Sequence, residues 1–175
     1  MKSFSLPLDN IEGLSGLKAG EEIFISGELF TARDRVHKLI SSGKADWPFK
    51  LKGSGIYYTG PTPAKENYPL GSCGPTTSYR MDPFTPELYK KGLAVTIGKG
   101  PRSQEVSDAI RESGGVYLVA YGGCGALYGG TVKKAEVLAF EEFGPQAVYR
   151  IEVEDFPAIV GIDSRGKSIF SGEIK

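Results

Sequence analysis

Apolar residues along this chain recur with two different spacings, and a spacing of two predicts strands. Ile23 and Ile25 occupy alternate positions of one segment, as in a strand with one buried face. Other segments are short apolar runs bounded by glycine or proline, which is typical of fully buried strands. The expected strands are 21–27, 53–60, 93–100, 115–123, 147–163 and 167–172, the last two joined by a turn at 164–166.

Three further segments show helical spacing between recognisable start and stop residues. In the first, which runs from Arg33, Val36 and Ile40 fall on one face. Ser and Thr are favoured at a helix N-cap, and glycine is favoured just beyond the last turn. The expected caps and terminators, helix by helix, are Thr31 and Gly43, Thr85 and Gly92, and Ser103 and Gly114.

Short strands and helices that follow one another in this way predict a mixed α/β fold. The sequence contains no internal repeat and no linker-like segment, so residues 1–175 are expected to form one domain. A chain of 175 residues buries roughly two-thirds of its unfolded surface, which is enough for a sizeable core.

Composition excludes several classes of protein. Lys plus Arg (21) equals Asp plus Glu (21), which argues against nucleic-acid-binding and membrane-surface proteins. The first residues lack the apolar core of a signal peptide, and no apolar run is long enough to span a membrane. Two cysteines and one histidine are too few for a self-contained zinc or iron–sulfur site, and His37 is expected to be structural. We therefore expect a reduced, cytoplasmic protein that holds no metal by itself.

Glycine is unusually frequent, with 24 residues, and it clusters most strongly in "YGGCGALYGG" (121–130). This stretch follows an expected strand, but its glycine spacing does not fit a dinucleotide-binding fingerprint. Close packing of this backbone against a neighbouring element or subunit explains the glycines better. In that interpretation Cys124 is a small buried thiol and not a nucleophile.

The stretch "GSCGPTTSYRMD" (71–82) gathers hydroxyl groups and a guanidinium on an irregular segment. Thr76, Thr77 and Ser78 could offer hydroxyls to one point, and Arg80 could bind a carboxylate through two N–H groups. The competing interpretation is a turn followed by a capped helix, in which the threonines bond their own backbone.

Two further cations stand at expected element ends. Arg33 lies at the start of a helix, where a cation is unfavourable unless an anion binds there, and Lys99 lies between two glycines at a strand end. Alone, each would also suit an ordinary surface residue. Only Asp34 and Asp82 stand nearby as carboxylates, so Arg33, Arg80 and Lys99 together suit a small dianion such as a dicarboxylate, if the fold brings them together.

These stretches, in the same order, resemble the C-terminal part of class I fumarases and of the related tartrate dehydratases. The resemblance includes "GELFTARDRVHK", "YYTGPTPA", "GSCGPTTSYRMD", "TIGKG" and "YGGCGALYGG", and covers nearly the whole chain. It departs from the family at Tyr79, where a small residue is usual. It implies a swivelling β/β/α domain, found either behind a larger domain or as a separate β subunit. A chain of 175 residues resembles the β subunit.

The resemblance also implies roles for particular residues. By position, Thr76 matches the proposed base that takes a proton from the carbon of malate. Arg33, Arg80 and Lys99 match the groups that bind the substrate carboxylates. A larger, cysteine-bearing α subunit holds a [4Fe–4S] cluster through three cysteines, so the site is completed in a hetero-oligomer and this chain alone is expected to be inactive.

The expected function is therefore that of the β subunit of an iron–sulfur hydro-lyase that interconverts fumarate and L-malate. Two alternatives stay open. One is the β subunit of L-tartrate dehydratase, because the same anion site would serve both substrates. The other is a non-catalytic module that binds an organic anion, and it differs from the catalytic subunits in needing no partner.

Overall fold

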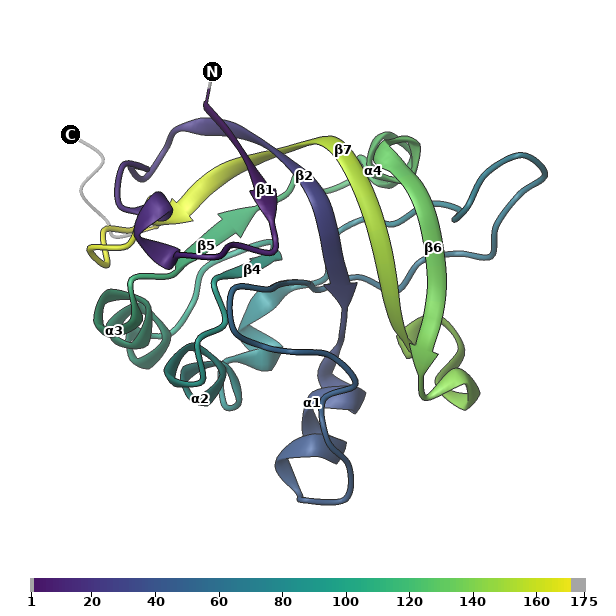
Figure 1. The fold of residues 1–175 in the computed structure, drawn as a ribbon, viewed down its shortest axis with the longest axis horizontal. Coiled ribbons are helices and arrows are strands. Elements are labelled where there is room, and N and C mark those ends of the chain that lie inside the picture. Colours follow the sequence, from purple (N-terminus) through teal and green to yellow (C-terminus); the bar gives the residue numbers. More distant parts are fainter. Residues whose placement is uncertain (1, 171–175) are drawn as a thin grey trace.

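The computed structural model describes residues 2–170 and shows the mixed α/β fold that the sequence predicts (Figure 1). The strands are β1 (Lys2–Leu6), β2 (Glu22–Thr31), β3 (Gly55–Tyr57), β4 (Val95–Gly98), β5 (Val116–Val119), β6 (Val132–Ala139) and β7 (Val148–Ile162). The α-helices are α1 (Asp34–Ser41), α2 (Thr85–Lys90), α3 (Gln104–Ser113) and α4 (Gly125–Thr131). Short 3₁₀ helices are η1 (Ile11–Leu14), η2 (Ser78–Met81) and η3 (Glu141–Gln146).

The strands form one sheet that closes on itself. Strands β1 to β5 lie parallel to one another in chain order. The long strand β7 runs antiparallel, pairs with both β2 and β5, and carries β6 on the outside of this closure. Because the parallel strands point the same way, the loops after β2, β3, β4 and β5 gather at one end of the sheet, where ligand sites commonly form.

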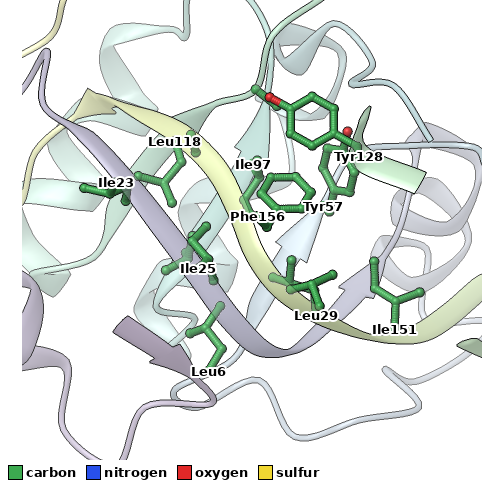
Figure 2. Packing of buried hydrophobic residues seen from close by; sticks show 14 of the residues in the cluster. Leu6, Ile23, Ile25, Leu29, Tyr57, Ile97, Leu118, Tyr128, Ile151 and Phe156 are labelled. Atoms are coloured by element: carbon green, nitrogen blue, oxygen red, sulfur yellow. The ribbon is translucent and has the colours of Figure 1, made fainter. Parts of the chain in front are cut away.

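The core lies inside this closed sheet, where β2 and β7 cross in front of β3 and β4 (Figure 2). Ile23 and Ile25 of β2 are both buried there, which confirms the predicted alternation. Three aromatic rings fill the adjoining space: the Phe156 ring centroid lies 5.1 Å from that of Tyr57 and 4.5 Å from that of Tyr128. These contacts fix β7 against β3, whose end leads into the candidate site.

Some helix ends agree with the sequence. The Ser103 side chain accepts a hydrogen bond from the Val106 N–H, and Gly114 ends α3 with a φ of 79°, so both predicted ends of this helix are confirmed. Gly43 and Gly92 also have positive φ values just beyond α1 and α2, as expected.

The two predicted threonine N-caps are wrong. Thr31 is the last residue of β2, and its hydroxyl donates to the Ala147 carbonyl and accepts the Tyr149 N–H. Thr85 is the first residue of α2, where its hydroxyl donates to the carbonyl of Met81. The Thr31 hydroxyl is therefore hydrogen-bonded to distant backbone, and the Thr85 hydroxyl to the backbone of the preceding turn, so neither caps a helix.

The final predicted strand forms only in part. Ser168 pairs with Ile162 as an isolated antiparallel bridge after the turn at 164–166, and residues 171–172 of that prediction lie outside the described residues. The preceding expected strand, 147–163, is present as β7 from Val148 to Ile162.

The glycine-rich stretch forms α4, and its backbone packs closely on the 71–74 loop. A Cβ at Gly129 would lie 2.5 Å from the carbonyl oxygen of Gly71, and a Cβ at Gly125 would meet the Ser72 hydroxyl. The Cys73 N–H donates to the Gly125 carbonyl at 3.0 Å. The predicted close backbone packing is thus confirmed, although the helix itself was not expected.

This packing predicts opposite effects at two neighbouring glycines of α4. Gly129→Ala should lower the free energy of unfolding by about 1–3 kcal/mol, because the new methyl group meets backbone that cannot rotate away. Gly130→Ala should be neutral or stabilising by up to about 1 kcal/mol, because no atom lies within 4 Å of the new Cβ. Urea unfolding of the two variants measures the difference, and equal stabilities would mean that α4 does not pack on Gly71.

Candidate active site

Two of the three cations expected to bind an anion, Arg33 and Lys99, lie at the carboxyl ends of parallel strands. Arg33 follows β2 by two residues and precedes α1, and Lys99 follows directly after β4. Strand β3 lies between β2 and β4, so the two cations flank the end of β3. This is the end of a parallel sheet at which fixed loops most often bind ligands.

The segment that carries Thr76 is held between these strand ends by its backbone. The Thr76 N–H donates to the Tyr58 carbonyl, just past β3, at 2.6 Å. The Lys99 N–H donates to the Thr76 carbonyl at 3.3 Å, and the Ser78 N–H donates to the Lys99 carbonyl at 2.9 Å. Thr76 and Lys99 are therefore direct neighbours, although 23 residues separate them in the sequence.

A glycine at the end of β4 makes this approach possible. A Cβ at Gly98 would meet the hydroxyl of Ser78 and would lie 3.2 Å from the Thr76 carbonyl oxygen. Any side chain at this position would therefore push Thr76 away from Lys99. Ser78 itself is buried, and its hydroxyl lies 2.9 Å from the Tyr117 hydroxyl, so it serves the fold and not a ligand.

Arg33 occupies the N-cap position of α1 and lies against the loop after β3. Its Nη1 atom would be 3.1 Å from a Cβ at Gly60, so the guanidinium covers that glycine. The side chain is 25% exposed, and Nε is buried without a hydrogen-bond partner. Its only ion-pair contact among residues 2–170 is with Asp34, at 4.0 Å. A partly buried guanidinium with unused donors is suited to an anionic ligand.

Arg80 lies on η2, four residues beyond Thr76, and its side chain is exposed. It lines a cleft of about 550 Å³ together with Tyr79, Asp82 and Ser103. Asp82, the one carboxylate near Arg80 in the sequence, binds Arg102 and does not neutralise Arg80. Tyr79 is 62% exposed, so the large side chain that departs from the family pattern points to solvent and does not crowd the site.

Four of the candidate side chains have hydroxyl or charged groups without a hydrogen-bond or ion-pair partner in the described part of the chain. The side chains of Thr76, Thr77, Arg80 and Lys99 make no hydrogen bond or ion pair with any residue from 2 to 170. Thr77 is the N-cap of η2 but makes no side-chain capping bond. The alternative in which the threonines bond their own backbone is therefore wrong, and the hydroxyls remain available.

A sequence profile of the protein family described as the fumarase C-terminus matches residues 4–173. The chain belongs to this family. Fumarate hydratase 2 of Leishmania major is 39% identical to it over 173 residues, and the anaerobic class I fumarate hydratase of Escherichia coli K12 is 38% identical over 163 residues. A protein named L(+)-tartrate dehydratase subunit beta in Methanocaldococcus jannaschii is 40% identical over 163 residues.

These relatives differ in how much of their length corresponds to this member of the fumarase C-terminus family. The match covers 94% of the chain but 30% of the Leishmania protein, and 90% of the chain but 30% of the Escherichia coli protein. It covers 88% of the chain and 84% of the tartrate dehydratase subunit beta. None of the helices within residues 2–170 is long and apolar enough to cross a membrane.

Arg102 was not expected from the sequence, and its side chain is fully buried in this family member. Its Nε donates to the Asp82 carboxylate at 2.6 Å, Nη1 to the Thr96 hydroxyl at 3.1 Å, and Nη2 to the Thr85 hydroxyl at 2.8 Å. Burial alone would lower the pKa of Arg102, but its neighbours, chiefly Tyr58 and Asp82, raise that pKa above its usual range. The one available signal was its place immediately before the N-cap of α3.

His37 is a buried structural histidine, as expected. Its Nδ1 lies 2.9 Å from the Arg33 carbonyl oxygen, which can only accept, so Nδ1 carries the proton. Aromatic rings surround it, with the Trp47 and Tyr58 centroids at 5.1 Å and 5.7 Å. Burial lowers the pKa of His37 to about 4, so the imidazole is neutral at pH 7 and holds Arg33 through a hydrogen bond.

This pKa predicts how stability depends on pH. Between pH 6.5 and 4 the unfolded chain binds a proton on His37 and the folded chain does not. The neutral His37 therefore contributes about 3 kcal/mol to the free energy of unfolding above pH 6.5, and this contribution is lost as the pH falls from 6.5 to 4. The free energy of unfolding of wild type and His37→Gln, measured from pH 4 to 7, should diverge in slope. Parallel curves would mean that His37 titrates normally.

The two cysteines do not fit a [4Fe–4S] cluster. Cys73 is buried, and burial raises the pKa of its thiol to about 12, whereas cluster ligands are thiolates. Cys124 is the N-cap residue of α4 and is half-buried. Among residues 2–170, no group of three or more His, Cys, Asp or Glu side chains is placed to hold a metal ion.

Proposed function

We propose that this chain is the β subunit of an iron–sulfur hydro-lyase that interconverts fumarate and L-malate. The observation that carries the proposal is the placement of Thr76 beside Lys99, with Arg33 across the end of β3, all with unused polar atoms. The relatives named fumarate hydratase supply the reaction, and the similarity to a subunit beta over 84% of its length supports the subunit role.

Each candidate residue has a role that follows from its chemistry. Arg33, Arg80 and Lys99 bind the substrate carboxylates, because a guanidinium or ammonium group attracts a carboxylate strongly where water is excluded. Arg33 is already partly buried, and the α subunit would cover the exposed side chains of Arg80 and Lys99. The negative charge that develops when the neighbouring C–H loses its proton spreads onto the carboxylate, and these cations stabilise it.

Thr76 accepts the proton from the carbon in this proposal. A hydroxyl is a poor base unless a positive charge favours its deprotonated form, and the Lys99 backbone is bonded directly to that of Thr76. The backbone bond to Tyr58 holds Thr76 in place while its side chain stays free to meet substrate. The backbone of Thr76 is therefore held beside that of Lys99, from which the ammonium group would act on the hydroxyl.

The [4Fe–4S] cluster is assigned to a larger, cysteine-bearing α subunit, because the thiols of this chain do not fit it. When bound there, the cluster supplies a Lewis acid for the substrate hydroxyl. The site is then completed at the interface of a cytoplasmic hetero-oligomer, and this chain alone has no turnover.

L(+)-tartrate is the second candidate substrate. The relative named as the tartrate dehydratase subunit beta is matched over 84% of its own length, at 40% identity. The cations described above would bind the carboxylates of either substrate, so this site alone does not favour fumarate.

Anaerobic co-purification tests the proposal. The tagged chain is isolated from the cells that produce it, and the eluate is assayed for iron, fumarate hydration and L(+)-tartrate dehydration. A larger iron-containing partner with fumarate hydration supports the proposal, and tartrate dehydration alone would replace the substrate. A tagged Thr76→Ala chain purified in parallel controls for contaminating hydratases. Binding of dicarboxylate without partner or iron would instead indicate a non-catalytic module.

A further inference from the structure

The buried side chain of Arg102 is linked by three sets of contacts to the segments that carry Arg80, Thr76 and Lys99. The first tie is Asp82, which ends η2 two residues after Arg80 and has a side chain only 10% exposed. One of its oxygens accepts from Arg102 Nε, and the other accepts the Ser103 N–H at 2.6 Å. The carboxylate therefore joins η2, and with it Arg80, to the start of α3.

The second tie runs to Thr76 through Tyr58. The Arg102 Cζ lies 5.3 Å from the centroid of the Tyr58 ring, and Nη2 lies 3.4 Å from the Tyr58 hydroxyl. The carbonyl of the same tyrosine accepts the Thr76 N–H at 2.6 Å. The residue that orients Thr76 is thus held through its ring by the guanidinium.

The third tie runs to the loop that begins at Lys99. The guanidinium of Arg102 also faces the Tyr117 ring, at 4.9 Å from its centroid. The Tyr117 hydroxyl donates to the Gly100 carbonyl at 2.8 Å and meets the Ser78 hydroxyl at 2.9 Å. This contact fixes the backbone on both sides of the hydrogen bond between Ser78 and Lys99.

We propose that Arg102 is a positioning residue that holds Thr76, Arg80 and Lys99 as one rigid unit, without touching substrate. The proposal rests on the proposed function for the chemistry that these groups perform. Stability alone does not explain a fully buried guanidinium, since well-packed apolar side chains are often at least as stabilising as a buried ion pair. What apolar side chains lack is a planar fork of donors, which fixes several partners in defined directions.

Arg102→Lys tests the proposal in the assembled complex. Lysine keeps the charge near Asp82 but cannot reach all of the partners of the planar fork, so the ties should loosen. We expect kcat to fall and KM to rise, lowering kcat/KM by about 100-fold at a temperature well below the melting point. Arg111→Lys is the matched control, because the Arg111 side chain is 59% exposed and, within residues 2–170, forms an ion pair only with Asp108 of its own helix. Its kcat/KM should stay within twofold of wild type.

Hydrogen exchange of the chain by itself provides a measurement that needs no turnover. In Arg102→Lys, the amides of Thr76 and Ser78 should exchange at least tenfold faster, while those of β2 and β7 should keep their wild-type rates. Asp82→Asn removes the same ion pair from the other side and should give the same local pattern, so the test does not depend on one variant folding well.

The outcomes separate this proposal from the function on which it rests. Local loss of protection together with the kinetic defect supports the positioning role. Uniformly faster exchange, or wild-type kcat and KM in the folded variant, would show that Arg102 serves stability only and would overturn the proposal. If the assembled wild-type complex has no hydro-lyase activity but protection is lost locally, the proposed function fails while the positioning of these residues stands.

Discussion

Thr76→Ala should abolish fumarate hydration by the assembled complex, with kcat reduced by about 10²–10⁴-fold, the range for loss of a positioned acid or base. The chain should still fold and still bind its partner. The Thr76 side chain makes no hydrogen bond within residues 2–170, and the bonds that hold this segment come from its backbone. Steady-state kinetics on complexes with matched iron content measures the effect.

Two controls make this prediction specific. Thr76→Ser keeps the hydroxyl and should retain part of the activity. Thr77→Ala makes the same change one residue along, where the side chain of an extended segment points the opposite way, and should have little effect. If Thr77→Ala is inactive and Thr76→Ala retains most of the wild-type kcat, then the base has been assigned to the wrong threonine.

Local patterns in the sequence predicted much of the fold. The alternation of Ile23 and Ile25, the cap at Ser103 and the terminator at Gly114 depend on neighbours within a few residues, and all three are confirmed. Thr31 failed as an N-cap because its hydroxyl partners, Ala147 and Tyr149, lie more than 100 residues away. The N-cap prediction considers only the residues that directly follow, so it could not include hydrogen bonds between the Thr31 hydroxyl and distant backbone.

Helix α4 was missed for a similar reason. Glycine disfavours helix, and five of the ten residues in 121–130 are glycine, so no propensity rule predicts one there. The helix exists because its bare backbone fits against the loop at Gly71, which is a tertiary contact. The glycines themselves did predict close packing, and that expectation needed no knowledge of the partner.

In the candidate site, too, local patterns were predictable and tertiary contacts were not. Arg33, Arg80, Lys99 and Thr76 could be named from motifs, but the contact between the Thr76 and Lys99 backbones and the position of Arg33 beyond β3 depend on the parallel order of β2, β3 and β4, which no local pattern encodes. The role of Arg102 could not be predicted from a local motif, because its hydrogen-bond partners are 6 to 44 residues away in sequence.

Arg33→Met and Lys99→Met should each weaken dicarboxylate binding by at least about 30-fold, as expected when a carboxylate loses a charged partner in a partly desolvated site. The measurements are KM for fumarate and the inhibition constant of succinate, which binds but has no leaving group. Arg35→Met is the control for Arg33, because the Arg35 side chain is exposed and lies 3.8 Å over the Phe143 ring. It should leave both constants unchanged.

The two substitutions together also report on the ligand. Arg33 and Lys99 follow strands on either side of β3, about 10 Å apart by strand spacing, so a dicarboxylate can place one end against each. A dicarboxylate should therefore lose affinity in both variants, and a monocarboxylate such as acetate should lose it in only one. If succinate binds both variants with wild-type affinity, the cations do not converge on one ligand, and the proposed site is wrong even if the complex proves to be a hydro-lyase.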